Sequence, residues 1–284
     1  MIPGKFDMNG WIRRVFARPF SQIFQEPVPR WRWDHFSLAS HTRALLDFVG
    51  CDCVFDVGAH EGQYACFLRN HVGYTGPIFS FEPVRELFDK LSEKSRTDPQ
   101  WNVFPCALGA AEGISTIHVI RGARAKSSLP PSPSDAQTED ATSLRVETET
   151  VPVRTVDDIL AEAGVPPFSS IFLKMDTRGC DGEILQGVSR SLSRIAALQS
   201  EVSCTPTARN MNLWLESLES FENRGFSVRG MFMVARDRDL QVVEFDWLGI
   251  NDLRSSVSSP PPIRKHDNQA VKTTAWRKSV PKGS

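Results

Sequence analysis

Apolar and polar residues follow two periods along the chain, and segments with each period come in a regular order. Short apolar runs rich in β-branched and aromatic residues predict strands, whereas apolar residues that recur every three to four positions predict amphipathic helices. The expected strands cover residues 51–57, 78–82, 102–108, 114–120, 151–153, 170–176, 196–202, 226–234 and 240–245. The expected helices cover residues 38–49, 61–71, 83–91, 155–160 and 210–224, and a further helix has its apolar face at Leu185, Val188, Leu192 and Ile195.

This order of elements predicts an α/β protein with a doubly wound, mostly parallel, seven-stranded Rossmann-like sheet. Strands alternate with helices from residue 51 to residue 202, which is typical of parallel sheets covered on both faces. The charged turn 235–239 joins the last two strands, which predicts a C-terminal antiparallel hairpin. Residues 114–120 and 151–153 are expected to pair with each other, also antiparallel.

Composition predicts one domain, at residues 41–254, with a segment on either side. Residues 1–40 are expected to be a lead-in with a basic amphipathic helix at 11–18, which suits a membrane surface or, as we favour, packing on the domain. Residues 255–284 are expected to be a basic, disordered tail. Within the domain, a proline-rich and then polar run predicts a mobile insertion at about residues 122–147.

Charge and cysteine use narrow the class of protein. Six lysines and arginines face three acids in residues 1–36 and one acid in residues 255–284, so the part between is net acidic. Nucleic-acid sites need clustered basic residues, and a nucleic-acid partner is therefore not expected. The six cysteines form no CxxC pair, which predicts free thiols in a reducing compartment. Without a long apolar run or a signal-peptide core, we expect a cytoplasmic protein with no transmembrane segment.

The stretch Val54–Gly62 is the main candidate for ligand binding, because it runs from an apolar strand into a glycine-spaced turn that opens a helix. Glycines let the backbone approach a ligand, and the first N–H groups of the helix face the same place. Dinucleotide sites have Gly-x-Gly-x-x-Gly, but here His60 and Gln63 replace the second and third glycines, and there is no Walker motif. With Glu82 at the end of the second strand, the pattern favours a ligand that has an amino group and two ribose hydroxyls. S-adenosylmethionine fits that description.

Several segments, in order, resemble the FkbM-type methyltransferases, S-adenosylmethionine-dependent enzymes with the class I fold. Phe55–Gly62 is similar to the first motif of the family, Phe81–Pro83 to its second-strand acid and Ala107–Gly109 to the segment after the third strand. The most specific likeness is Leu173–Asp181, which is similar to the family signature Lys-x-Asp-x-x-Gly-x-Glu/Asp. The likeness extends over residues 51–250.

Two departures bear on the acceptor rather than on the cofactor. Arg178 stands where the family often has Gln, and Thr207-Ala208 replaces an aromatic residue.

The resemblance implies a cofactor site and a catalytic pair. Glu82 would accept both ribose hydroxyls of S-adenosylmethionine, and Asp56 would orient its ammonium, directly or through water. Asp176 would be the base for an acceptor hydroxyl, with Lys174 beside it, although a structural ion pair at a strand end explains the same two residues. The expected cofactor-binding residues are Asp56, Gly58, His60, Glu61, Gly62, Glu82 and Ala107, and His60 is also a rival base.

We therefore expect an O-methyltransferase that acts on a hydroxyl of a sugar or another small metabolite. Asp181 and Glu201 complete an acidic group with Asp176, but carboxylates at strand ends are expected without a metal, and no metal site is predicted. The alternatives are an NAD-linked oxidoreductase, which the failed glycine spacing disfavours, and a non-catalytic cofactor-binding scaffold. Because Asp56, Glu82 and Asp176 are all present, the scaffold is also disfavoured.

Overall fold

The computed structural model describes residues 37–121, 126–128, 145–162, 167–168, 170–177, 179–204 and 214–254. The expected basic tail, nearly all of the lead-in and most of the expected insertion lie outside these residues. Arg178 and Thr207-Ala208 lie outside them as well.

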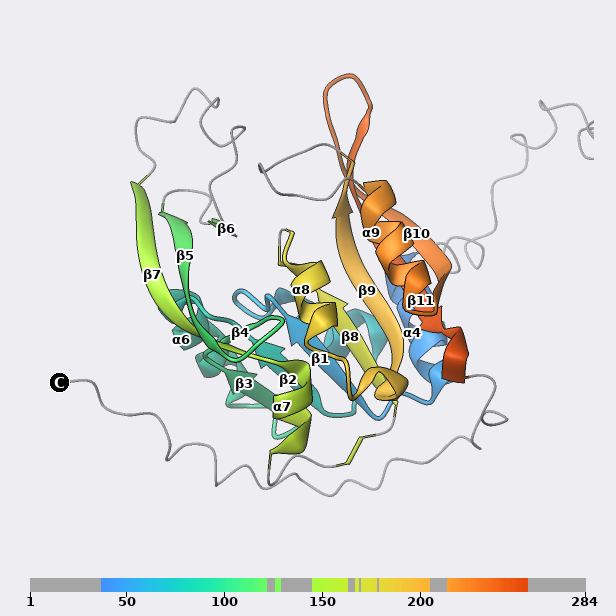
Figure 1. Cartoon of the computed structure of the whole chain (residues 1–284), viewed down its shortest axis with the longest axis horizontal. Coiled ribbons are helices and arrows are strands. Elements are labelled where there is room, and N and C mark those ends of the chain that lie inside the picture. Colours follow the sequence, from blue (N-terminus) through green and yellow to red (C-terminus); the bar gives the residue numbers. More distant parts are fainter. Residues whose placement is uncertain are drawn as a thin grey trace, which may run out of the picture.

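Seven strands form one mostly parallel sheet, which confirms the predicted fold class. The strand order is β10-β11-β9-β8-β1-β2-β3. From β1 the chain builds outward to β3, and then returns to place β8 and β9 on the other side of β1 (Figure 1). The strand order therefore reverses between β1 and β8, and ligands of such sheets bind at the carboxyl ends next to this point. The parallel strands are β1 (Cys53–Val57), β2 (Ile78–Phe81), β3 (Trp101–Phe104), β8 (Ile171–Met175) and β9 (Ile195–Ser203), and the hairpin strands β10 (Phe226–Arg236) and β11 (Val242–Asn251) are antiparallel.

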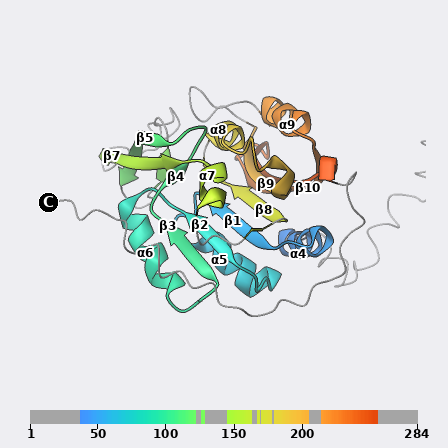
Figure 2. The same ribbon diagram turned by 60° about the horizontal axis from the view of Figure 1, so that its bottom comes forward.

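Helices cover both faces of the sheet (Figures 1 and 2). One face carries α4 (Leu38–Val49), α5 (Gln63–Phe67), which continues as a π-helical turn at Leu68–Val72, and α6 (Arg85–Ser95). The opposite face carries α7 (Val156–Ala161), α8 (Asp181–Gln186) and α9 (Trp214–Asn223). Two short 3-10 turns, Leu192–Arg194 and Asp252–Arg254, complete the helical elements in the described part of the chain.

Helix α4 shows why these segments are helical where the sequence predicts it. The Ser37 side chain accepts a hydrogen bond from Ser40 N at 3.1 Å, which caps the start of the helix. At the other end Gly50 has φ 58°, and its N–H bonds back to the carbonyls of Leu46 and Asp47. Both predicted bounds of this helix are confirmed.

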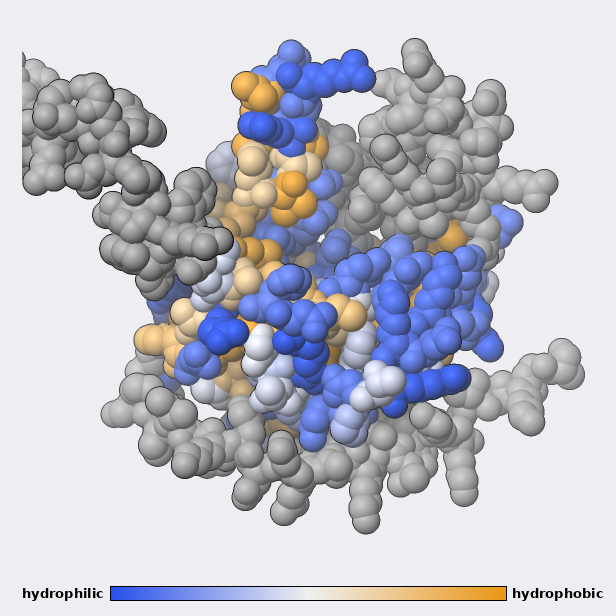
Figure 3. Space-filling model, turned by 180° about the vertical axis from the view of Figure 1, so that it is seen from behind, coloured by the Kyte–Doolittle hydropathy of each residue, from blue (hydrophilic) through white to orange (hydrophobic). Residues whose placement is uncertain are grey.

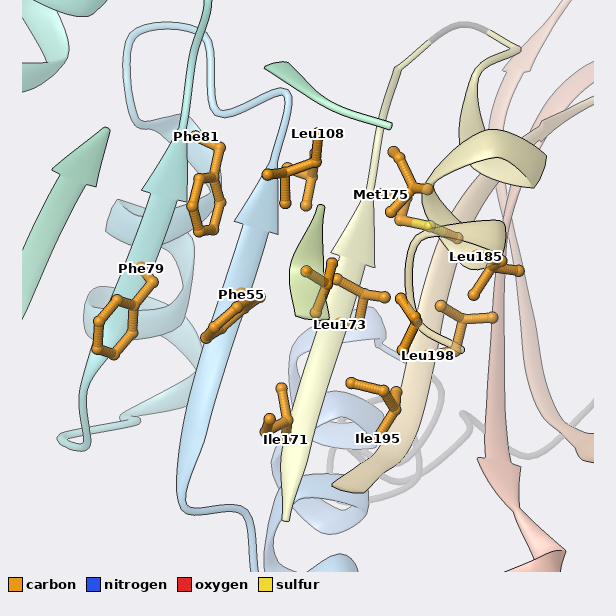
Figure 4. Close-up of a cluster of buried hydrophobic side chains, with 14 of the residues drawn as sticks. Phe55, Phe79, Phe81, Leu108, Ile171, Leu173, Met175, Leu185, Ile195 and Leu198 are labelled. Carbon is orange, nitrogen blue, oxygen red and sulfur yellow. The ribbon is translucent and has the colours of Figure 1, made fainter. Parts of the chain in front are cut away.

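The core lies on both sides of the sheet, as a doubly wound fold requires. Every residue of β1 and of β8 is buried, which confirms that these central strands are covered on both faces. The α7, α8 and α9 side is filled by aromatic and aliphatic side chains that extend across the strands (Figure 4). Those labelled are Phe55, Phe79, Phe81, Leu108, Ile171, Leu173, Met175, Leu185, Ile195 and Leu198.

A second, four-stranded sheet adjoins the main one, with the order β4-β7-β5-β6. Its strands are β4 (Ala107–Leu108), β5 (Gly113–Arg121), β6 (Lys126–Ser128) and β7 (Arg145–Arg154). The antiparallel pairing of β5 with β7 confirms the prediction, and β7 begins six residues earlier than expected, within the predicted insertion.

The helix expected after Gly179 is the main error of the sequence analysis. Helix α8 ends at Gln186, and Ile195, expected on the helix, is the first residue of β9. The intervening chain is held in a turn by Asp157, whose carboxylate accepts hydrogen bonds from Arg190 N at 2.7 Å and Ser191 N at 2.9 Å. The apolar spacing is present because the side chains are buried, not because the backbone stays helical.

The β10–β11 hairpin projects from the body of the molecule and carries exposed apolar side chains (Figure 3). Met231, Met233 and Leu240 are exposed on it. Within the described part of the chain, no helix combines the length and the apolar character needed to cross a membrane.

Candidate active site

A cavity of about 610 Å³ lies at the carboxyl ends of the central strands, next to the point where the strand order reverses. Its wall combines residues from β1, β2, β8, β9 and β11 with residues of the second sheet. Six of the predicted site residues line it, namely Gly58, His60, Glu82, Ala107, Lys174 and Asp176. Asp56, Glu61 and Gly62 do not.

The turn after β1 is fixed by the backbones of both neighbouring strands. The N–H groups of Gly58 and Ala59 both donate to the Phe81 carbonyl at 3.1 Å. Gly58 has φ 74°, and a Cβ on it would overlap the carbonyl oxygen of Asp176. Glycine is thus required here by the close approach of the residue that follows β8, as well as by the backbone conformation.

Glu61 and Gly62 serve the packing of this loop on the protein. A Cβ on Gly62, which has φ 85°, would lie 2.6 Å from the Trp101 ring. The Glu61 carboxylate lies 2.9 Å from Lys90 Nζ and 3.7 Å from Lys94 Nζ, on helix α6. Both residues thus contact other parts of the protein and do not line the cavity.

Glu82 is a buried carboxylate on the cavity wall. Its Oε2 accepts from His60 N at 2.8 Å and its Oε1 accepts from Val84 N at 2.9 Å. Burial raises the pKa of Glu82 to about 7, although these two N–H donors act in the opposite direction. Each carboxylate oxygen can accept a further hydrogen bond, so Glu82 suits a ligand with two adjacent hydroxyls.

Apolar residues adjoin Glu82 on the side of the second sheet. They provide a surface that suits a flat aromatic ring beside the bound hydroxyls. These residues are Pro83, Ala107, Leu108, Ile117 and Val153. A buried carboxylate that can accept hydrogen bonds from two hydroxyls, next to an apolar surface, fits the ribose and the adenine of S-adenosylmethionine.

Lys174 lies between two carboxylates. Its Nζ is 3.0 Å from Asp56 Oδ1 and 3.7 Å from Asp176 Oδ2. Burial disfavours the ammonium, but the charges of Asp56 and Asp176 outweigh burial, so the pKa of Lys174 is raised. Asp56 is fully buried beneath the cavity and also accepts from Ser80 Oγ at 3.2 Å. The expected ion pair between Lys174 and Asp176 is present, with Asp56 as the nearer partner.

Asp176 is the more accessible carboxylate, with 36% of its side chain exposed and a position on the cavity wall. The loop that carries it is tied down by Asp181, which accepts hydrogen bonds from the hydroxyls of Thr177 and Ser200. Burial raises the pKa of Asp181. Among the residues that the structure describes, no group of three or more His, Cys, Asp or Glu side chains is arranged to hold a metal ion.

The polar residues of the cavity wall that sequence reasoning missed include Tyr64, Gln199 and Asp246. Tyr64 lies within the expected helix 61–71, and Asp246 directly follows the expected strand 240–245. Gln199 lies within a segment that resembles the family, and its position two residues before Glu201 on one strand is the signal that could have identified it.

The profile of the FkbM methyltransferase domain matches residues 56–228, and the chain belongs to this methyltransferase family. The cofactor of the family is S-adenosylmethionine, which agrees with the fit of the cavity wall and leaves the oxidoreductase alternative without support.

A hexuronic acid methyltransferase, AglP of Haloferax volcanii, is 29% identical over 146 residues, which are 51% of this chain and 53% of AglP. The chain thus matches about half the length of that relative.

The chain also matches solved structures of methyltransferases. The methyltransferase FkbM of Methylobacillus flagellatus KT has a TM-score of 0.43 at 18% identity, over 69% of this chain and 43% of that one. An S-adenosylmethionine-dependent methyltransferase of Aquifex aeolicus has a TM-score of 0.39 at 16% identity, over 87% of this chain and all of that one.

Proposed function

We propose that the protein is an O-methyltransferase whose acceptor is a hydroxyl of a sugar or another small metabolite. The observation that carries the proposal is the position of Asp176 on the wall of the same cavity as Glu82, with the Lys174 ammonium 3.7 Å behind it. A carboxylate in this position suits a hydroxyl nucleophile, because an alcohol reacts poorly until its proton leaves. The match to a hexuronic acid methyltransferase supports a sugar as the acceptor.

S-adenosylmethionine, when bound, supplies the methyl group that is transferred. Glu82 would hold the two ribose hydroxyls, the apolar residues beside Ala107 would contact the adenine, and the turn at Gly58–His60 would lie along the rest of the cofactor. Asp56 would act indirectly, because it contacts Lys174 and Ser80 rather than the cavity.

Asp176 accepts a hydrogen bond from the acceptor hydroxyl and takes its proton at Oδ as the oxygen becomes nucleophilic. Lys174 keeps Asp176 in place, and its ammonium offsets the charge of the two carboxylates around it. The site thus contributes mainly by holding the reacting groups in line, together with one proton transfer.

Calorimetry with S-adenosylmethionine, followed by a methyl-transfer assay with D-glucose and D-glucuronate, tests the proposal. Asp176→Asn is expected to bind S-adenosylmethionine within about threefold of the wild-type affinity and to lose about 100-fold or more in turnover. Glu82→Gln is expected to weaken cofactor binding about tenfold or more, since it loses a charged acceptor for hydroxyls.

Asp239→Asn, on the exposed tip of the hairpin, is the matched control and is expected to behave as the wild type. Absence of S-adenosylmethionine binding by the wild type, or full turnover by Asp176→Asn, would contradict the proposal.

A further inference from the structure

Four buried polar residues form a row across the middle of the sheet, at the floor of the cavity. Ser80 on β2 is in register with Asp56 on β1, Asp56 with Lys174 on β8, and Lys174 with Gln199 on β9. Because register partners on neighbouring strands point to the same face, the four side chains lie side by side. Each is at most 6% exposed, so each needs a partner within the protein.

Tyr64 of helix α5 connects the last two members of this row. Its hydroxyl donates to Gln199 Oε1 at 2.5 Å, and its ring lies 5.1 Å from Lys174 Nζ. An ammonium at this distance from an aromatic ring is attracted by the ring face. Tyr64 therefore fixes the position of Lys174 and the orientation of the Gln199 amide together.

The orientation of Gln199 determines what it offers to β11. Since its Oε1 accepts from Tyr64, its Nε2 donates to Asp246 Oδ1, at 3.0 Å. Asp246 is in register with Glu201 of β9, and both residues line the cavity. In the sheet, β9 and β11 lie on the opposite side of β8 from Glu82. Asp246 and Glu201 therefore form a part of the cavity wall that is separate from the cofactor-binding residues and is available to the acceptor.

This wall is rich in hydrogen-bond acceptors. Asp246, Glu201 and Asp176 contribute carboxylates, and the ammonium of Lys174 is shared between Asp56 and Asp176. Carboxylates accept hydrogen bonds from hydroxyls and repel a carboxylate of the ligand. The described residues of the wall thus suit an acceptor that offers several hydroxyls and carries no negative charge.

We propose that Asp246 binds a second hydroxyl of the acceptor, that Gln199 and Tyr64 are its positioning residues, and that the acceptor is an uncharged sugar. This inference rests on the proposed methyl transfer and names the class of acceptor for the same site.

Saturation-transfer NMR with D-glucose and D-glucuronate, in the presence of S-adenosylhomocysteine, tests this inference. The wild type is expected to bind glucose more tightly than glucuronate. Asp246→Asn is expected to weaken glucose binding about tenfold, although Asn can still accept the hydrogen bond from Gln199. Tyr64→Phe keeps the ring over Lys174 but releases the Gln199 amide, and a loss of about threefold is expected.

Cofactor affinity separates this role from a purely structural one. Both variants are expected to bind S-adenosylmethionine as the wild type does, and Asp239→Asn is expected to bind glucose unchanged. Should Asp246→Asn not fold, Tyr64→Phe still tests the inference, because it releases the Gln199 amide that positions Asp246.

Unchanged glucose affinity in Asp246→Asn, glucuronate binding at least as tight as glucose binding, or no binding of either sugar would overturn the inference. A wild type that does not bind S-adenosylmethionine would contradict the proposed function instead, so the two failures are distinguishable.

Discussion

Glu82 and Lys174 show how burial acts on two charged residues of one cavity with different results. Glu82 has two neutral N–H donors as hydrogen-bond partners, and burial therefore dominates its titration. Lys174 is equally enclosed but faces two carboxylates, which keep it charged. The acid thus becomes sensitive to pH near neutrality, while the base does not.

The pKa of Glu82 makes the stability of the protein depend on pH. Its pKa is raised from 4.5 to about 7, so between these values the folded protein holds a proton that the unfolded chain has released. Unfolding then releases a proton, and the free energy of unfolding falls as the pH rises, by about 3 kcal/mol over this window. Urea unfolding at pH 5 and pH 8 measures this fall. Glu82→Gln should show a smaller fall, and an identical fall in both proteins would contradict the assignment.

Gly58 is expected to be intolerant of a side chain. Gly58→Ala puts a Cβ at φ 74° and against the Asp176 carbonyl, so we expect a loss of about 1–3 kcal/mol in unfolding free energy and weaker cofactor binding. Gly182→Ala is the control, because its Cβ would meet no atom within 4 Å and it lies in helix α8. Alanine should stabilise that helix by about 0.5–1 kcal/mol. Equal effects of the two substitutions on the free energy of unfolding in urea would contradict the prediction that Gly58 cannot accept a side chain.

At the scale of secondary-structure elements, the row from Ser80 to Gln199 joins four strands through side chains as well as through the backbone. Lys174→Met removes the ammonium and leaves Asp56 buried without its counter-ion, which is expected to cost about 3–5 kcal/mol. Adding Asp56→Asn removes the uncompensated charge, so the double variant should be more stable than Lys174→Met alone. Urea unfolding of the two single variants and the double variant measures the coupling, and additive losses would show that the row does not act as a unit.

The elements that sequence predicted well have local causes. Helix α4 begins at a serine cap and ends at a glycine, and both signals lie within its own segment. The turn at residues 187–191 has a distant cause, since the Asp157 carboxylate that holds it comes from a different helix. No pattern within residues 180–195 reveals that contact, and the apolar spacing therefore predicted a helix that is too long.

In the candidate site, too, some residues could be predicted from the sequence and some contacts could not. Glu82 and Asp176 directly follow strands, and Lys174 lies near the carboxyl end of β8. Because the carboxyl ends of parallel strands meet at one edge of the sheet, the sequence could group these three residues. The contact of Asp246 with Gln199 depends on the antiparallel register of β11 with β9, and that register is set by packing of the whole hairpin. Asp56 lies within the strand that the sequence predicts at residues 51–57, but its complete burial beneath Lys174 cannot be inferred from the sequence.

At the scale of the whole molecule, the sheet separates two hydrophobic cores, and the reactivity of the cysteines can show how well these cores exclude solvent. All six thiols are free, and Cys51, Cys53 and Cys106 are at most 5% exposed. Burial raises the pKa of Cys51 and of Cys106 to about 12 and that of Cys53 above its ordinary value. A thiol needs both access and its thiolate form to react, and the two cores deny both to these three residues.

Labelling with N-ethylmaleimide at pH 8, followed by peptide mass spectrometry, is therefore expected to show slow reaction of the three buried cysteines. A thiol with a pKa near 12 is about one part in ten thousand thiolate at this pH, so Cys51 and Cys106 should react at least about a hundredfold more slowly than half-buried Cys66. Cys53 should be equally slow.

Saturating S-adenosylmethionine should slow the three buried thiols further, because a ligand that binds only the folded state lowers the population of molecules in which these thiols are exposed. Guanidinium chloride should make all six react alike, which controls for differences among the peptides. Rapid labelling of Cys53 in the native protein would contradict the two-core packing, since Cys53 is fully buried in the centre of the sheet.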